Sequence, residues 1–146
     1  MKIVDANVLL HAIDEQARGH DVARAWLDAS LQGSEPVGFG WVVMLAFVRL
    51  STHPAVFPHP LDVRRSTAVL QAWLAQPAAV VVDPTQRHLE ILRGLVDAVG
   101  TAGNLVNDAH LAALAVEHGA EVVSFDRDFG RFPGLRWRRP EAPQAI

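Results

Sequence analysis

The sequence predicts an α/β domain of three layers, in which helices cover both faces of a mainly parallel central sheet. Short β-prone runs alternate with segments whose apolar residues recur at helical spacing, and neither an internal repeat nor a linker interrupts the alternation. A chain of 146 residues, half of them hydrophobic, can bury a substantial core. We therefore expect one domain over residues 1–140 and a C-terminal tail over residues 141–146.

The first predicted unit is a strand, a turn and a helix. Residues 2–4 form a short β-prone run. Asp5 and Asn7 are both favourable helix N-caps, and they precede a brief apolar helix that continues to about Ile13.

The next segments are mostly apolar. A helix is expected from His20 to Leu31, where apolar residues recur at helical spacing, and Gly33 is placed to end it. Residues 36–40 fit a second short strand or an extended approach to the following helix. Residues 41–50 are apolar almost all round, which predicts a buried helix.

The middle of the chain contains a proline-rich loop. Residues 51–60 carry three prolines and no periodicity, so they are expected to join two helices. The second of these helices has its apolar face between Val63 and Leu74, and Pro77 closes it. Residues 78–82 are strand-like.

The last part continues the alternation. Thr85 is expected to cap a helix that ends before Gly100 and Gly103. The remaining predicted elements are a helix at residues 105–118, a strand at residues 121–125 and a final strand at residues 135–138.

The composition excludes several classes of protein. A net charge of −3 does not fit a protein that binds nucleic acid chiefly by neutralising phosphates, although local arginine clusters still allow phosphodiester recognition. The absence of cysteine excludes disulfides and thiolate metal sites and fits a reducing compartment. Neither a signal-peptide core nor a run of about 20 apolar residues occurs, so we expect a cytoplasmic protein without a membrane partner.

Four aspartates stand where a strand ends or a helix begins: Asp5, Asp108, Asp126 and Asp128. In an open parallel sheet these points converge on one edge, where ligands bind. One complete helix–strand unit separates Asp108 from Asp126, so both can return to that edge. Two carboxylates about 4 Å apart repel by roughly 4 kcal/mol at an effective dielectric near 20, so such a cluster needs protonation or a divalent cation. The pattern therefore predicts a shared site of Asp5, Asp108 and Asp126 in a metal-dependent enzyme.

Each aspartate also has a purely local explanation. Asp5 suits a helix N-cap, Asp108 lies in a first turn that favours negative charge, and Asp126 and Asp128 suit a turn. Asn7 favours the shared site, because a D-x-N turn can present both side chains at the edge of the sheet.

Three segments resemble the PIN-domain family, and within it the VapC toxins of type II (VapBC) toxin–antitoxin systems. They are I-V-D-A-N-V-L-L at residues 3–10, V-N-D-A-H-L-A-A-L-A at residues 106–115, and V-S-F-D-R-D-F at residues 123–129. The resemblance covers roughly residues 1–140. It implies a PIN-like α/β/α fold and an endoribonuclease that hydrolyses RNA with Mg²⁺ or Mn²⁺. It also implies a cognate VapB-like antitoxin, and it indicates a homodimer.

The same resemblance assigns roles to particular residues. Asp5, Asp108 and Asp126 match three acidic positions of the PIN site that hold metal, and Asp128 matches a further acid found in some members. The polar positions that support them are matched by Asn7 and Ser124.

This chain departs from the family in the helix predicted at residues 41–50. The family usually has a glutamate there, whereas this chain has Ala46 and no acid anywhere from residue 36 to residue 61. Loss of one carboxylate is expected to weaken metal affinity or to change the hydration of the metal. A PIN-like module that binds RNA or a partner without cutting therefore stays open as an alternative.

Other chemistries fit less well. Haloacid dehalogenase-like phosphatases carry D-x-D-x-T, whereas here Asn7 replaces the second acid and no lysine follows Lys2. No H-E-x-x-H pair supports a zinc site. The four tryptophans are expected in the core or an interface rather than under RNA bases. Arg49, the one charge on its predicted helix, fits either an ion pair with an active-site acid or a contact to phosphate.

Overall fold

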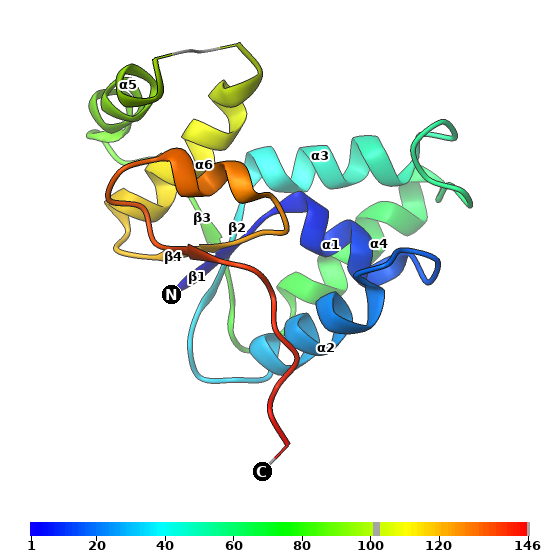
Figure 1. Cartoon of the computed structure of the whole chain (residues 1–146). Helices are drawn as coiled ribbons and strands as arrows, with labels where there is room; N and C mark the ends of the chain where they lie inside the picture. The colour runs from blue at the N-terminus through cyan, green and yellow to red at the C-terminus, as the bar shows by residue number, and fades with distance from the viewer. Residues whose placement is uncertain (101–102, 146) are drawn as a thin grey trace.

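The structure, a computed structural model, describes residues 1–100 and 103–145 and is built on a five-stranded sheet in the order β3-β2-β1-β4-β5 (Figure 1). The strands are β1 Lys2–Val4, β2 Val37–Gly40, β3 Ala79–Val82, β4 Glu121–Val123 and β5 Trp137–Arg138. The strand pairings are parallel throughout the described residues. The predicted α/β class with a mainly parallel sheet is confirmed. The predicted tail ends at Ile146, which lies outside the described residues.

Six α-helices are described. They are α1 Ala6–Ile13, α2 His20–Leu31, α3 Trp41–Ser51, α4 Val63–Leu74, α5 His88–Val99 and α6 Val106–Glu117. Two short 3₁₀ segments, Gly103–Leu105 and Arg127–Arg131, precede α6 and follow β4. Figure 1 shows α1, α2 and α4 gathered on one side of the sheet and α5 and α6 on the other, which gives the three predicted layers. No helix in the described residues is long and apolar enough to cross a membrane.

The strand β1 lies at the centre of the sheet, between β2 and β4. Lys2 pairs with Val37 on one side and with Glu121 on the other, and Val4 pairs with Val123. Because the strands are parallel, the residues that follow β1, β2 and β4 all emerge at the same edge. The sheet therefore brings Asp5 next to the segment after Val123.

Small residues allow close packing around this centre. On α6, alanines alternate with leucines in an almost fully buried run from Ala109 to Ala115. Gly38 is crowded in the middle of β2, where an added Cβ would lie 2.6 Å from Val82 Cγ2. The core therefore fixes the position of α6, and with it the position of the first-turn residue Asp108.

Expectations about three element ends are wrong. The final strand, expected at residues 135–138, covers only Trp137–Arg138. The helix that Thr85 was expected to cap starts at His88. Thr85 lies in the preceding turn, where its Oγ1 accepts from the N–H of Arg87 across 3.2 Å and its own N–H donates to Glu117 across 3.1 Å. The strand expected at residues 121–125 ends at Val123, and Ser124, which follows it, donates its hydroxyl to Asp5.

The prediction of a buried α3 is also wrong in part. Val43, Met44 and Phe47 are buried, but Trp41 is 57% exposed and Leu45 is 64% exposed. One face of α3 therefore packs on the body of the protein, and the other presents apolar side chains to solvent.

Candidate carboxylate site at the sheet edge

Asp5 follows the central strand and begins α1. Its Oδ1 accepts from the N–H of Ala6 across 2.7 Å, as an N-cap residue does, and its own N–H donates to the carbonyl of Val123 across 3.0 Å. Its other oxygen, Oδ2, accepts from the Ser124 hydroxyl across 2.7 Å. The N-cap role and the place in the shared cluster therefore belong to the same side chain.

Ser124 is the centre of a polar network that joins β1 to β4. It is fully buried, its hydroxyl donates to Asp5, and its oxygen accepts from Asn7 Nδ2 at 3.0 Å and from the N–H of Asp126 at 2.9 Å. The amide oxygen of Asn7 accepts from the N–H of Phe125 across 3.1 Å. Asn7 thus does not cap a helix: it lies inside α1 and fixes the chain that carries Asp126.

Asp108 approaches the same place from α6. It lies in the first turn of that helix and is half-buried. Burial, followed by the negative charges of Asp5, Asp126 and Asp128, raises the pKa of Asp108 to about 6. Burial also raises the pKa of Asp5, opposed by hydrogen bonds from Ser124 and Ala6 and reinforced by the charge of Asp126. The carboxylates are therefore close enough to repel one another.

Asp126 and Asp128 lie in the turn after β4. Asp126 caps the 3₁₀ segment, where its Oδ1 accepts from the N–H of Asp128 across 2.8 Å. Asp128 is exposed and reaches the others through its charge on Asp108. All four predicted aspartates thus lie at one edge of the sheet, and their individual roles in chemistry stay predictions.

The donor set suits a hard divalent cation that keeps water ligands. Within the described residues no three carboxylate or imidazole groups lie close enough to hold an ion by themselves. Mg²⁺ typically needs only one or two protein carboxylates and completes its octahedron with water. Asp5 and Asp108 meet that requirement, and Asp126 can contribute through a water molecule. A cation would also relieve the repulsion that raises the pKa of Asp108.

A cleft of about 460 Å³ leads to these carboxylates. Asp5 and Asp108 line one end, and Ala46 and Arg49 of α3 line it too. Ala46 therefore faces the site, at a position where a glutamate side chain would enter the cleft. Arg49 forms no ion pair with a described acid, so the interpretation that pairs it with an active-site acid has no support. Asn107 lines the same cleft and was not predicted from the sequence. Its position next to Asp108 in the chain is the signal from which it could have been predicted.

A second polar cluster, also missed, joins α5 to α6. The imidazoles of His88 and His110 lie 2.8 Å apart through Nε2 and Nδ1, and His88 Nδ1 lies 3.1 Å from Glu117 Oε1. The Glu117 side chain is 1% exposed and also accepts from Thr85. Burial, and next the charge of His88, lowers the pKa of His110. This cluster fastens α5 to α6 and does not touch the carboxylates.

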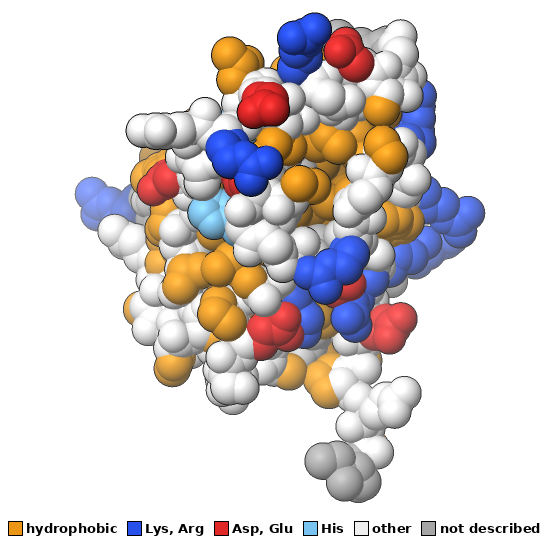
Figure 2. Space-filling view, turned by 90° about the vertical axis from the view of Figure 1, so that its left-hand side faces the viewer, with side chains coloured by type: hydrophobic (Ala, Val, Ile, Leu, Met, Phe, Trp, Pro, Cys, Tyr) orange, Lys and Arg blue, Asp and Glu red, His pale blue; other side chains and the backbone are white. Residues whose placement is uncertain are grey.

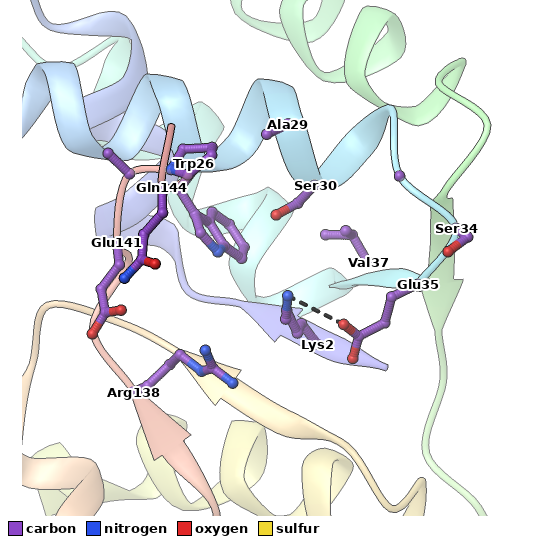
Figure 3. A pocket seen from close by; sticks show the side chains of 13 residues that line it. Lys2, Trp26, Ala29, Ser30, Ser34, Glu35, Val37, Arg138, Glu141 and Gln144 are labelled. Carbon is purple, nitrogen blue, oxygen red and sulfur yellow. Dashed lines mark ion pairs between the residues drawn. The ribbon is translucent and has the colours of Figure 1, made fainter. Parts of the chain in front are cut away.

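The opposite edge of the sheet has a cavity of about 410 Å³, in which most of the charged groups already have partners (Figure 3). Lys2 Nζ lies 3.1 Å from one Glu35 oxygen, and the amino group of Met1 lies 3.2 Å from the other. Arg138 is paired with Glu121. Its lining therefore offers less unpaired charge for a ligand than the carboxylate edge does.

Comparison with known proteins supports the resemblance to the PIN-domain family and its VapC group. The model of the PIN domain family matches residues 2–135. The chain is 55% identical to Ribonuclease VapC37 of Mycobacterium tuberculosis, over 97% of this chain and 99% of that protein. It is 40% identical to Ribonuclease VapC31 of the same species, over 96% of this chain and 99% of that protein.

Solved structures share the fold. VapBC2 from Rickettsia felis, bound to a DNA fragment from the promoter, superposes with a TM-score of 0.70 at 17% identity, covering 94% of this chain and 97% of that one. DNA-bound VapBC from Salmonella typhimurium superposes with a TM-score of 0.65 at 20% identity, covering 94% and 96%. At these identities the likeness concerns the fold.

Proposed function

The chain belongs to the PIN-domain family, in its VapC group, and on that basis we propose that it is an endoribonuclease toxin that hydrolyses RNA at an aspartate-bound Mg²⁺ or Mn²⁺ ion. Membership of a group whose relatives are named ribonucleases supports the nuclease activity. The observation that carries the metal site is the meeting of Asp5, Asp108 and Asp126 from three separate elements at one sheet edge, where each carboxyl can supply hard oxygen ligands.

The contacts of each residue suggest its role in the proposed metal site. Asp5 and Asp108 would hold the ion, with Asp126 or Asp128 completing its shell directly or through water. The bound ion supplies a water molecule of lowered pKa and positive charge beside the phosphate oxygens. Ser124 keeps one Asp5 oxygen fixed through its 2.7 Å hydrogen bond, so the carboxylate does not need to reorient.

The cleft beside α3 fits a protein partner as well as RNA. Its wall includes Val42 and Leu45, and the exposed Trp41 and Leu45 extend the apolar surface along the helix. We assign this surface to a VapB-like antitoxin, which would block the route to Asp108. Homodimerisation, the second expected association, would be read from the mass of the free protein in light scattering, and antitoxin binding from the mass of the co-expressed complex.

The alternative function is an inactive PIN-like module that binds RNA or a partner. One observation favours it: Ala46 faces the cleft where the family usually has a glutamate, so this site has one carboxylate fewer. The two functions differ in whether RNA is cut.

The deciding experiment is cleavage of structured and single-stranded RNA by the purified protein with Mg²⁺, Mn²⁺ or EDTA. The proposal requires cleavage that EDTA abolishes and that Asp5→Ala and Asp108→Ala each reduce by at least about 100-fold. Asp97→Ala, on the exposed face of α5, is the matched control and should cut normally. Cleavage that persists in EDTA, or in either site variant, would rule the metal mechanism out; binding without cleavage would favour the module.

A further inference from the structure

A third cavity, of about 410 Å³, lies on the side of α1 and α2 and is lined in part by Phe125, the residue before Asp126. We call it the Phe125 pocket; its lining includes His11, Arg18, Gly19, Val22, Phe125 and Arg139. Its volume is in the range of small-molecule binding sites. The lining combines an apolar wall with two exposed arginines, a composition that suits a ligand with both an apolar part and a negative charge.

The pocket is connected to the carboxylates along two elements. Phe125 lies between Ser124 and Asp126, and its N–H is bonded to Asn7. On α1, His11 follows Asn7 by one turn, a separation of about 6 Å along the helix axis. A nucleic-acid strand with one phosphate at the carboxylates would therefore place a neighbouring nucleotide at this pocket.

The arginine nearest the aromatic ring is held in position. The Arg139 guanidinium lies 5.5 Å from the centre of the Phe125 ring, at a distance typical of a cation–π contact. The His11 ring packs on the same side chain, with centroids 4.6 Å apart. Gly19 permits this packing, since an added Cβ would lie 2.6 Å from His11 Nδ1 and 2.8 Å from Phe125 Cζ. Arg139 thus presents its charge at a defined place.

The positive charge of the pocket is not neutralised by the protein. Neither Arg18 nor Arg139 forms an ion pair with a carboxylate in the part of the chain that the structure describes, whereas Arg24, Arg93 and Arg138 do. The chain as a whole carries a charge of −3, and the face in Figure 2 mixes Lys and Arg with Asp and Glu. The two arginines thus form a local positive pair on a chain of net negative charge.

We propose that the Phe125 pocket binds the nucleotide of single-stranded RNA that neighbours the cleaved bond. Arg18 and Arg139 hold its phosphate, and its sugar and base lie against the apolar part of the lining around Val22. This inference rests on the proposed function, because the nucleotide belongs to the ribonuclease substrate. It assigns these two arginines to substrate binding and gives them no part in the bond cleavage.

A merely structural role for the cluster makes a different prediction. In that case Arg139 only fastens the segment after β5 to α1, and Arg18, which has no described partner for its side chain, does nothing. Arg18→Gln is therefore the decisive variant, since it removes charge without disturbing the stacked rings. Arg64→Gln, on the exposed face of α4, removes the same charge elsewhere and is its control.

The first test does not depend on cleavage. Uridine and adenosine 5′-monophosphate are titrated into the ¹⁵N-labelled protein in EDTA, with inorganic phosphate in a parallel titration. The nucleotides should shift the amide resonances of Gly19 and Phe125, Arg18→Gln should remove the shifts, and Arg64→Gln should keep them. Equal shifts with inorganic phosphate would mean an anion site without nucleotide recognition and would overturn the proposal, as would no shift with any ligand.

The second test uses RNA cleavage. Arg18→Gln should raise KM about tenfold with kcat nearly unchanged, since a charge-assisted contact to substrate is lost. It should also lower the slope of log KM against log salt by about 0.7, the value for one phosphate contact on a single strand. Unchanged KM and salt slope would refute nucleotide binding at the Phe125 pocket, whereas cleavage of RNA by the same protein would still support the proposed ribonuclease function. Nucleotide binding in a protein that cuts no RNA would instead uphold the pocket as a nucleotide site and refute the proposed function.

Discussion

The hydroxyl of Ser124 donates to Oδ2 of Asp5 across 2.7 Å and so joins the end of β4 to the end of β1 at the carboxylate edge. The same oxygen accepts from Asn7 and from the N–H of Asp126. One buried serine therefore sets the relative positions of two predicted metal ligands that are more than a hundred residues apart in the chain.

Ser124→Ala should weaken both the site and the fold. It leaves Asp5, Asn7 and the N–H of Asp126 each without one partner, which is expected to cost about 1–3 kcal/mol of unfolding free energy in denaturant titrations. Loss of an orienting contact should reduce Mn²⁺ affinity or cleavage about 10- to 100-fold, measured by calorimetry and RNA cleavage. Ser34→Ala, at an exposed position, should change neither. Unchanged Mn²⁺ affinity in Ser124→Ala would contradict the assignment of Asp5 as a metal ligand.

Asp108 should make the metal-free protein less stable at neutral pH. Burial, followed by the charges of Asp5, Asp126 and Asp128, raises the pKa of this carboxyl to about 6, above its unfolded value. Ionisation then opposes folding, so the contribution of this group to stability falls as pH rises from about 4 through about 6.

Thermal melts of the wild-type protein and Asp108→Asn in EDTA measure this effect, because the amide stays neutral. The variant should have the higher Tm above about pH 6, and the difference should vanish near pH 4. Asp97→Asn, exposed on α5, should show no such pH-dependent difference. A Tm difference independent of pH would contradict the raised pKa of Asp108.

Ala46→Glu should restore a carboxylate to the cleft. Because Ala46 lines the same space as Asp5 and Asp108, the new acid should raise Mn²⁺ affinity and speed cleavage by about tenfold or more. Without metal it should lower the Tm, since it adds a like charge to the cluster. Thr67→Glu adds the same charge on the exposed side of α4 and serves as the control. If the Ala46→Glu and Thr67→Glu variants have the same Mn²⁺ affinity, a carboxylate at position 46 does not contribute to metal binding.

Glu117→Ala should loosen α5 without disabling the carboxylates. It leaves the N–H of Thr85 and Nδ1 of His88 without a protein partner, which is expected to destabilise the protein by about 1–2 kcal/mol in chemical denaturation. Cleavage measured well below the Tm should be nearly normal. The exposed Glu90→Ala on α5 should have little effect on stability. A large loss of cleavage in folded Glu117→Ala would show that the α5–α6 cluster also positions the site.

Two glycine substitutions should act in opposite directions. Gly38→Ala places a Cβ 2.6 Å from Val82 Cγ2 and should destabilise the sheet by about 1–3 kcal/mol. Gly94→Ala meets no atom within 4 Å inside α5 and should stabilise the protein by about 1 kcal/mol through helix propensity. Both changes are read from denaturant midpoints. A stable Gly38→Ala protein would mean that the centre of the sheet can expand.

The features that depend on local pattern could be predicted from the sequence. Alternating strands and helices fix a parallel sheet, and parallel strands bring the residues after β1 and β4 to one edge, so the meeting of Asp5 with Asp126 follows from the chain order. The features that depend on side chains from distant elements could not. Nothing near Thr85 in the sequence indicates that its N–H and hydroxyl donate to Glu117, which lies on another helix. The pairing of His88 with His110 likewise depends on the relative rotation of α5 and α6, which no local pattern encodes.

The N–H of Asp5 is itself part of the hydrogen bonding between the two central strands, through the carbonyl of Val123. Amide protons in such positions exchange with solvent only when the whole domain opens, whereas the turn that carries Asp128 lies at the exposed rim and can open alone. Deuterium uptake should therefore be slowest at Asp5 and much faster at Asp128. On heating, the carboxylate edge should therefore open in two stages, with the exposed rim opening reversibly before the central strands separate.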